Sequence, residues 1–201
     1  MKILVFGATG MIGQRIVAEL TDRGHEVTGV SRTGGPVKGD VRDTATLAKG
    51  HDAIVSAIAP PRDGTDPEGP FLEANRALVD GAREAGVRRL IVVGGAGSLK
   101  VAPGLDLVDT PDFPEIYKRE ALAAREVLRL LRQVDDLDWT YISPAAEIAP
   151  GSRTGIYRIG HEDLLSDSEG RSFISAEDYA AAVGDELERG THPRGRITVA
   201  Y

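Results

Sequence analysis

Residues 1–13 read MKILVFGATGMIG, a short apolar run that leads into three glycines spaced by three residues. The run at residues 3–6 has the length of a buried strand, and the glycines carry the chain through a sharp turn into a helix. In such a turn Gly7 permits the tight bend, Gly10 lets the backbone approach a pyrophosphate, and Gly13 lets the helix pack closely on the strand. The N–H groups that begin the helix can then bind an anion. The motif therefore predicts a phosphate cradle for a dinucleotide.

Length and composition limit the classes of protein that remain. The 201 residues are enough for one α/β domain with a substantial core. A net charge of -7 does not provide the basic face that nucleic acids need, so no nucleic acid partner is expected. The chain has no cysteine, which excludes disulfides, thiolate metal sites and cysteine nucleophiles. No run of about 18 apolar residues could span a membrane, and the short apolar N-terminal run does not resemble a signal peptide, so we expect a cytoplasmic location.

Apolar runs alternate with amphipathic stretches along the whole chain. The expected strands cover residues 3–6, 27–30, 37–39, 53–58, 90–93 and 139–142, with an edge strand at 197–199. The expected helices cover residues 11–23, 44–49 with Asp43 as the cap, 71–85, 114–133 and about 175–189. Three connections without a clear period, at about 59–70, 99–113 and 144–171, are expected to be loops that cover a substrate. This order predicts an α/β fold, with a Rossmann-like doubly wound parallel sheet forming one domain over residues 1–201.

In such a sheet, ligands bind beyond the carboxyl ends of the strands. The ends that matter here are residues 7–13, 57–60, 94–98 and 143–147. Residues 94–98 read GGAGS, and this second glycine-rich exit from a buried strand suggests another place where backbone approaches a ligand. The glycines there could also serve only to permit a turn.

The residues at the end of the second strand, Ser31-Arg32-Thr33, bear on whether the cofactor is NAD or NADP. An NAD-binding fold has an acidic residue at this point to hold the ribose hydroxyls. Arg32 can instead pair bidentately with a 2′-phosphate, which favours NADP over NAD, although NAD stays possible. The alternative is that Arg32 is a solvated surface residue.

Four stretches, at residues 7–13, 75–94, 94–99 and 139–144, together resemble the atypical short-chain dehydrogenase/reductase superfamily. More narrowly, the chain resembles the small bacterial NAD(P)H-binding members, the group of NADH-flavin reductases related to flavin/biliverdin-IXβ reductases. The likeness runs nearly end to end and includes residues 173–179 and 196–199.

The resemblance implies a role for individual residues. The pyrophosphate would lie on Gly7, Thr9, Gly10, Met11, Ile12 and Gly13, and the adenosine phosphate on Arg32. The adenine would lie beside Asp40 and Val41, and the ribose and nicotinamide would lie along Ala57, Ile58 and Ala59. Gly94, Pro144 and Ala145 would approach the nicotinamide end. Ser98 would take the place of the substrate-facing serine of the superfamily.

One departure from the superfamily pattern bears on catalysis. Typical members pair a tyrosine with a lysine four residues later, and the lysine lowers the pKa of the tyrosine. Here Tyr117 is followed at that distance by Ala121, and Lys118 points about 100° away around the helix. The spacing places Tyr117 on the inward stripe of its helix, so it can be either a core residue or a catalytic acid. Ser98 can either donate a hydrogen bond to substrate or satisfy local backbone.

Three functions follow in order of preference. The first is an NADPH-dependent oxidoreductase that transfers hydride to a small conjugated acceptor such as a flavin or quinone, which needs no tyrosine acid. The second is a non-catalytic dinucleotide-binding sensor or regulator, and the third is a sugar-nucleotide epimerase or dehydratase. No metal is expected, because three adjacent residues such as His161, Glu162 and Asp163 cannot easily converge on one ion, and a solvated loop is favoured there. The chain is expected to be a monomer or homodimer.

Overall fold

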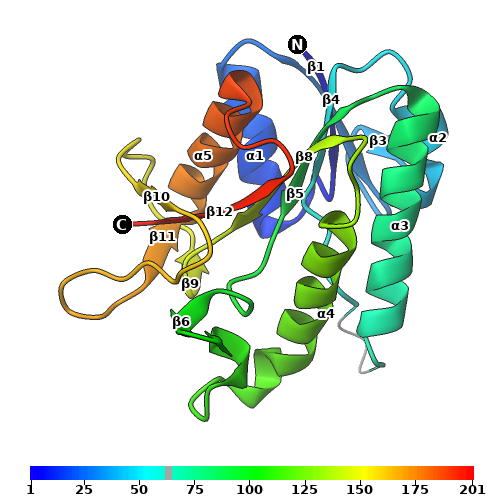
Figure 1. The fold of residues 1–201 in the computed structure, drawn as a ribbon. Coiled ribbons are helices and arrows are strands. Elements are labelled where there is room, and N and C mark those ends of the chain that lie inside the picture. The colour runs from blue at the N-terminus through cyan, green and yellow to red at the C-terminus, as the bar shows by residue number, and fades with distance from the viewer. Residues whose placement is uncertain (62–64) are drawn as a thin grey trace.

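A computed structural model describes residues 1–61 and 65–201 of the chain (Figure 1). In these residues a sheet of eight strands has the order β10-β12-β8-β5-β4-β1-β2-β3. Its members are β1 (Lys2–Phe6), β2 (Glu26–Ser31), β3 (Val37–Lys38), β4 (Ala53–Ser56), β5 (Arg89–Val93), β8 (Asp138–Ser143), β10 (Arg158–Gly160) and β12 (Gly195–Ala200). All neighbouring pairs are parallel except β10 with β12. The predicted doubly wound, mostly parallel sheet is confirmed.

Helices cover both faces of this sheet (Figure 1). On one face lie α1 (Met11–Asp22) and α5 (Ala176–Arg189), and on the other lie α2 (Thr44–Leu47), α3 (Glu68–Ala85) and α4 (Glu115–Leu131). Alternate residues of β1 enter the two cores, with Ile3 and Val5 under α1 and α5, and Leu4 and Phe6 under α3 and α4. A strand buried on both faces reads as a continuous apolar run, which is why the sequence locates these strands well.

The C-terminal strand is not at the edge of the sheet. β12 pairs with β8 on one side and with β10 on the other, so the predicted edge strand at 197–199 is wrong in position. The edge is β10, which comes from the segment expected to be a loop at 144–171. Because Arg158 and Ile159 of this strand are both exposed, no alternation of buried and exposed residues marks it in the sequence.

The expected loops contain further short elements. The segment 99–113 holds a hairpin of β6 (Lys100–Ala102) and β7 (Leu105–Asp106), followed by the 3-10 helix η2 (Leu107–Asp109). The segment 144–171 also holds β9 (Glu147–Ala149), which pairs with β11 (Phe173–Ser175). Helix α3 begins at Glu68, so residues 68–70 are helical, and residues 62–64 of that expected loop lie outside the described residues.

Two local predictions concern helix capping. Ser175 caps α5 as expected, because its Oγ accepts a hydrogen bond from the backbone N–H of Asp178 at 3.0 Å. Asp43 makes no side-chain cap on α2, so that prediction is wrong. Its carboxylate instead accepts from the backbone N–H of Asp40 at 3.0 Å, which closes a reciprocal capping box around the 3-10 helix η1 (Val41–Asp43).

Part of the expected covering segment lies along the helices of one face. Arg153 donates two hydrogen bonds to the carboxylate of Glu19 on α1, at 2.6 and 2.7 Å. Asp178 on α5 accepts hydrogen bonds from the backbone N–H groups of Thr154 and Gly155 at 2.8 and 2.7 Å. These contacts fix residues 153–155 against α1 and α5. Within the described ranges, no helix combines the length and apolar character needed to cross a bilayer.

Candidate functional site

The glycine turn after β1 is built so tightly that two of its glycines have no room for a side chain. Gly7 has a φ of +76°, and a Cβ atom on it would lie 2.4 Å from the carbonyl oxygen of Ala57. A Cβ atom on Gly13 would lie 2.0 Å from the carbonyl oxygen of Gly7. The turn, the start of α1 and the exit of β4 are therefore in direct contact, as the three-glycine motif predicts.

The N-terminus of α1 is free to receive an anion. Gly10 is its N-cap and provides no side-chain acceptor, and the first turn contains no acidic residue. In α5, by contrast, Ser175 caps the helix and Glu177 and Asp178 stand in the first turn. Because the unpaired N–H groups and the dipole of α1 are not neutralised by the protein, this end suits a pyrophosphate.

A cleft of about 450 Å³ opens beside this turn. Nine residues predicted from the sequence line it: Gly7, Thr9, Gly10, Arg32, Asp40, Val41, Ala57, Ile58 and Ala59. The structure thus brings the exits of β1, β2, η1 and β4 to one cavity, although these segments are spread over some fifty residues of sequence. A cleft that joins a helix N-terminus to a positively charged far end has the charge distribution that a phosphorylated dinucleotide requires.

The far end of the cleft holds a second arginine that the sequence did not single out. Arg42 lines the cleft with Arg32, and its Nη1 lies 3.0 Å from Oδ1 of Asp40. Among the described residues no carboxylate lies within ion-pair distance of Arg32. The sequence offered one signal for Arg42, its position two residues after Asp40, which was predicted to lie beside the adenine. The short 3-10 helix that contains Arg42 shows no periodic pattern of apolar residues, so the sequence did not indicate that Arg42 lines the cleft.

Six predicted cofactor residues do not line this cleft: Met11, Ile12, Gly13, Gly94, Pro144 and Ala145. The first three belong to the start of α1, directly beyond Gly10. Gly94 has a packing reason to lack a side chain, since a Cβ atom there would lie 2.2 Å from the ring of Tyr141. The side chains of Pro144 and Ala145 are buried, and Ala145 is part of the core under α1 and α5.

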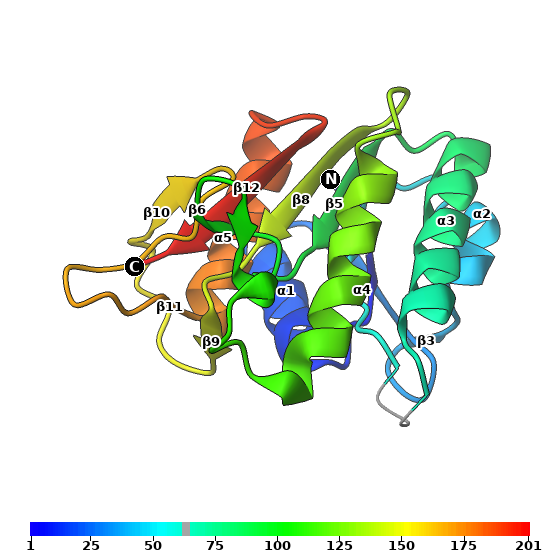
Figure 2. The same ribbon diagram turned by 60° about the horizontal axis from the view of Figure 1, so that its bottom comes forward.

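Tyr117 does not point into the core. It lies in the first turn of α4 and is 56% exposed, and its neighbour Ile116 is 80% exposed. The predicted inward stripe holds at Leu128 and Leu131 but is wrong at Tyr117, because α4 begins beyond the carboxyl edge of the sheet (Figure 2). Core packing of Tyr117 is therefore excluded, and one helical turn later Ala121 packs against Gly97.

Ser98 is buried, with 7% of its surface exposed, and is held by an arginine that sequence reasoning missed. Nη1 of Arg196 donates to Oγ of Ser98 at 3.3 Å, and Nη2 of Arg196 donates to the carbonyl oxygen of Ser98 at 3.3 Å. Nη2 also lies 2.5 Å from Oε2 of Glu162. Ser98 and Arg196 are 98 positions apart in the sequence, which explains why no local pattern revealed the contact.

Glu162 lies in an irregular segment between exposed neighbours, as expected, and 47% of its side chain is exposed, but its carboxylate is not free. Its carboxylate pairs with Arg196 at 2.5 Å and with Arg132 at 2.8 Å. Burial raises the pKa of Glu162, but the hydrogen bonds from the two arginines outweigh it and hold the pKa below its ordinary value. No group of three or more metal-ligating side chains occurs in the part of the chain that the structure describes.

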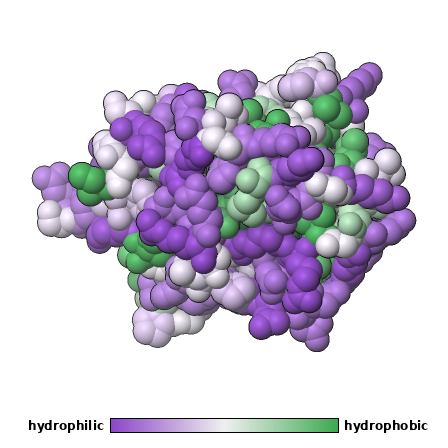
Figure 3. Space-filling view, turned by 90° about the horizontal axis from the view of Figure 1, so that it is seen from above, coloured by the Kyte–Doolittle hydropathy of each residue, from purple (hydrophilic) through white to green (hydrophobic). Residues whose placement is uncertain are grey.

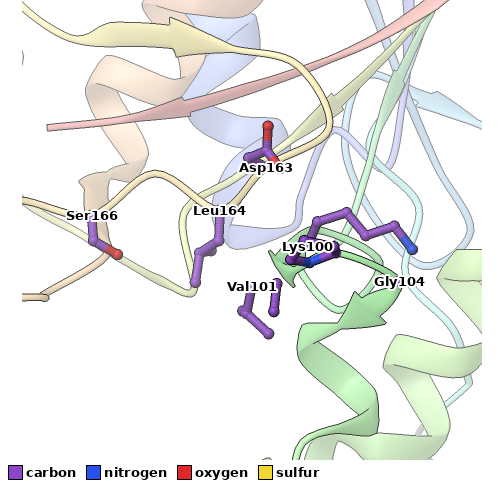
Figure 4. Close-up of a pocket in the computed structure, with 8 residues that line it drawn as sticks. Lys100, Val101, Gly104, Asp163, Leu164 and Ser166 are labelled. Atoms are coloured by element: carbon purple, nitrogen blue, oxygen red, sulfur yellow. The ribbon is translucent and has the colours of Figure 1, made fainter.

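A second cavity, of about 470 Å³, lies between the β6–β7 hairpin and residues 163–166 (Figure 4). It shares no residue with the cleft and contains none of the predicted site residues. Its one lysine, Lys100, is already paired with Asp106 through Nζ at 2.5 Å. The cleft at the glycine turn is therefore the candidate site.

Comparisons with known proteins agree with this geometry. A family model described as NAD(P)H-binding matches residues 7–189. A solved Burkholderia pseudomallei structure, provisionally called an exported protein, is 50% identical and has a TM-score of 0.91, and the match covers 100% of both chains.

Two further solved structures carry different provisional names. A Bacteroides thetaiotaomicron protein named as an epimerase is 40% identical with a TM-score of 0.90, over 100% of this chain and 96% of the other. A Streptococcus pneumoniae protein named as an NADH-flavin reductase is 35% identical with a TM-score of 0.89, over 100% of this chain and 99% of the other. These names differ in reaction type, so the similarity identifies the cofactor class and leaves the acceptor open.

Proposed function

Because the chain belongs to the NAD(P)H-binding family within the atypical short-chain dehydrogenase/reductase superfamily, we propose that it is an NADPH-dependent oxidoreductase that reduces a small conjugated acceptor such as a flavin or quinone. The observation that carries the proposal is the single cleft that contains both the glycine turn and the two arginines, Arg32 and Arg42. One end of this cleft suits a pyrophosphate, and the other suits a 2′-phosphate.

The residues of the chain would divide the binding of the cofactor between them. The N–H groups of α1 and the backbone at Gly10 would hold the pyrophosphate. Arg32 and Arg42 would hold the 2′-phosphate, and Ala57 and Ile58 would line the path toward the nicotinamide. A bound NADPH supplies a hydride, which carries two electrons and one proton. The protein's share of the reaction is to bind and orient the two reactants.

An apolar acceptor is supported by the distribution of exposed hydrophobic side chains. Five of the large ones lie on segments at the carboxyl edge of the sheet: Met11, Val101, Leu105, Ile116 and Tyr117 (Figure 2). The opposite end of the molecule is mostly hydrophilic, with hydrophobic residues scattered over it (Figure 3). None of the five lines the cofactor cleft, and Val101 lines the second cavity, so together they mark an apolar surface at the edge of the sheet where ligands of this fold bind.

The replacement of the usual lysine by Ala121 favours an acceptor that needs no tyrosine acid. A flavin or quinone takes a hydride into a conjugated system and can take its proton from water. The balanced reaction is NADPH, one proton and the oxidised acceptor going to NADP⁺ and the two-electron-reduced acceptor. Proximity and orientation then supply most of the rate enhancement.

The test is a spectrophotometric assay of NADPH oxidation against FMN, FAD, riboflavin and a set of benzoquinones and naphthoquinones, carried out without oxygen. Turnover with at least one acceptor, abolished by omitting the protein, is expected. Binding of NADPH without turnover of any acceptor would overturn the proposal and favour the second candidate, a dinucleotide sensor.

The sensor is also favoured by the replacement of the usual lysine by Ala121, because a sensor has no use for a catalytic acid. An epimerase is the third candidate and ranks below both, because its chemistry uses the tyrosine and lysine pair.

A further inference from the structure

The cavity of about 470 Å³ beside the β6–β7 hairpin has walls that the backbone holds in place. The N–H of Lys100 donates to the carbonyl oxygen of Glu162, and the N–H of Leu164 donates to the carbonyl oxygen of Lys100, both at 2.8 Å. Residues 162–164 thus lie parallel to the start of β6. Because main-chain hydrogen bonds join the two walls, the space between them is a built feature of the fold, with the volume of a small-molecule site.

Charged side chains brace both walls from behind. Nζ of Lys100 pairs with Asp106 at 2.5 Å, and Arg125 on α4 pairs with the same carboxylate at 3.2 Å, which ties the hairpin to α4. On the other wall, Glu162 pairs at 2.5 Å with Arg196 of β12, whose side chain is 1% exposed. The hairpin and residues 162–164 are therefore both fixed to the body of the molecule.

The interior of the cavity is mostly apolar. Its apolar lining comes from both walls and consists of Val101, Ala102, Pro103 and Leu164. The side chains of Val101 and Leu164 lie toward the space between the walls, whereas the amino group of Lys100 points away from it (Figure 4). The hydroxyl of Ser166 adds one hydrogen-bonding group to the lining. Such a lining suits an uncharged apolar group.

An anionic group is disfavoured in this cavity. Lys100 is the one cation among the described lining residues, and Asp106 already neutralises it. Asp163 also lines the cavity, and in the described part of the chain no cation lies within ion-pair distance of its carboxylate. Arg158 approaches from outside the lining, where its Nη2 donates to the carbonyl oxygen of Ser166 at 2.8 Å. A phosphate group would therefore meet a carboxylate without gaining a cation.

The cavity continues the line of the cofactor cleft along the carboxyl side of the sheet. The cleft covers the exits of β2, β1 and β4, and the strands that follow in the sheet are β5, β8 and β12. The hairpin follows β5 and lies on the side toward β12 and β10, away from β3 (Figure 2). β12 is three strand positions from β4, or about 14 Å at the usual spacing. An extended side chain on an acceptor at the nicotinamide end can cover such a span.

We propose that this cavity binds the apolar side chain of the acceptor, and that the acceptor is a neutral quinone with an isoprenoid or alkyl side chain and not a flavin nucleotide. The inference rests on the proposed function, since the quinone ring would lie on the nicotinamide held by the cofactor cleft. Covering the side chain between Val101 and Leu164 removes apolar surface from water, and this supplies affinity in proportion to the area covered. FMN and FAD carry phosphate on their side chains, which this lining disfavours.

A series of naphthoquinones tests the assignment by binding alone. Menadione and its derivatives with one, two or three isoprene units at carbon 3 are titrated calorimetrically into the NADP⁺-loaded protein, which cannot reduce them. The three-unit derivative should bind at least about tenfold more tightly than menadione, because it covers more apolar surface. Riboflavin and FMN form a second matched pair, and FMN should bind no more tightly than riboflavin.

Variants with a charge in the lining locate the binding of the side chain. Val101→Asp changes a position that is 40% exposed, so the fold should be kept. It should remove the gain given by the isoprene units and leave the affinity for menadione within about twofold. Ala102→Asp, at a second exposed lining position, should do the same. Ile156→Asp is the matched control and should leave the whole series unchanged, because Ile156 is 79% exposed and lines neither this cavity nor the cleft.

Two results would overturn the assignment. Equal wild-type affinities across the naphthoquinone series would show that the cavity takes no side chain. A gain that persists in the Val101→Asp and Ala102→Asp proteins would place the side chain elsewhere. Circular dichroism identifies a variant that fails to fold, and the other of the two then decides.

Turnover with NADPH is measured separately, so that this inference and the proposed function can fail independently. A side-chain gain in binding without turnover of any quinone would sink the proposed function and keep the cavity as a side-chain site. Turnover of menadione without any side-chain gain would do the reverse. Absence of both quinone binding and turnover would overturn both.

Discussion

Gly97 and Ala121 are packed so closely that a Cβ atom on Gly97 would lie 2.7 Å from the Cβ atom of Ala121. This contact seats α4 on the glycine-rich exit of β5. It occurs at the helix position where typical members of the superfamily carry the catalytic lysine. The absence of that lysine is therefore part of a close helix-to-loop contact, and the glycine at 97 serves packing, with no positive φ involved.

Replacing Gly97 tests how much stability this contact provides. Gly97→Ala forces a methyl group against Ala121 and should lower the free energy of unfolding by about 1–3 kcal/mol. Gly69→Ala is the control, because Gly69 lies in α3 with open space around it and alanine is the better helix former, so that variant should gain about 0.5–1 kcal/mol. Urea unfolding measures both. A Gly97→Ala protein as stable as wild type would show that α4 shifts away without cost.

The sequence predicted those parts of the site that lie within a few residues of a strand end. Gly7, Thr9 and Gly10 follow β1 directly, and Arg32 follows β2, so a strand pattern and a turn motif were sufficient to place them. Buried parallel strands are apolar on both faces, so continuous apolar runs also located the strands of the sheet in the sequence.

What the sequence did not predict depends on contacts between distant segments. Arg196 meets Ser98 only because β12 and β5 flank β8 in the finished sheet. The prediction that the Tyr117 side chain faces the core failed. The spacing of apolar residues along a helix shows which face is apolar, but it does not show where the sheet beneath the helix ends. The edge strand β10 was missed because exposed short strands carry no hydrophobic signal.

Gly10→Ala should separate cofactor binding from folding. Gly10 has a φ of -73° and a ψ of 164°, which alanine adopts readily, and its added Cβ atom would lie 3.3 Å from the carbonyl oxygen of Gly7, so the fold should be kept with a small shift in the turn. The added methyl group would stand at the N-terminus of α1, where the pyrophosphate is proposed to lie, and the affinity for NADPH should fall at least tenfold, or about 1.4 kcal/mol. Calorimetry and thermal unfolding give the two readouts. Unchanged affinity in a folded variant would exclude the pyrophosphate from this turn.

The two arginines of the cleft should discriminate between NADPH and NADH. In the wild type, NADPH should bind at least tenfold more tightly than NADH, on the order of 1.4 kcal/mol. Arg32→Ala and Arg42→Ala should each lower the affinity for NADPH and leave that for NADH within about twofold, because only the 2′-phosphate needs them. Arg42→Ala should have the smaller effect, since Arg42 is already paired with Asp40. Equal wild-type affinities for the two cofactors would contradict the assignment of both arginines.

Tyr117→Phe addresses the residue that the superfamily pattern would make the acid. The ring is 56% exposed, and no hydrogen bond of its hydroxyl occurs among the described residues, so the free energy of unfolding should change by less than about 0.5 kcal/mol. If water supplies the proton, kcat should stay within about twofold of wild type across the acceptor panel. A loss of 100-fold or more in kcat at unchanged KM would restore Tyr117 as the acid.

Asp178 should make the stability of the protein depend on pH. It is completely buried and accepts hydrogen bonds from Thr154 and from the hydroxyl of Tyr201, the latter at 2.6 Å. Burial raises the pKa of Asp178, but the hydrogen bonds from Thr154, Tyr201 and the backbone N–H of Gly155 outweigh it and hold the pKa below its ordinary value. The charged carboxylate is thus favoured in the folded state relative to the unfolded one.

The sign of the pH dependence follows from this lowered pKa. Stabilisation by Asp178 is fully present above the pKa of an unfolded aspartate, about 3.9, and is lost as the pH falls through the lower folded value. At pH 7, Asp178→Asn should lower the free energy of unfolding by about 1.5–3 kcal/mol, because the amide nitrogen cannot accept the hydrogen bonds that it replaces. The gap between wild type and variant should narrow as the pH is taken from 5 toward 2 in urea unfolding series. Asp22→Asn, at the exposed end of α1, controls for the loss of one negative charge. A gap that stays constant over this range would mean that Asp178 acts through shape and not through its charge.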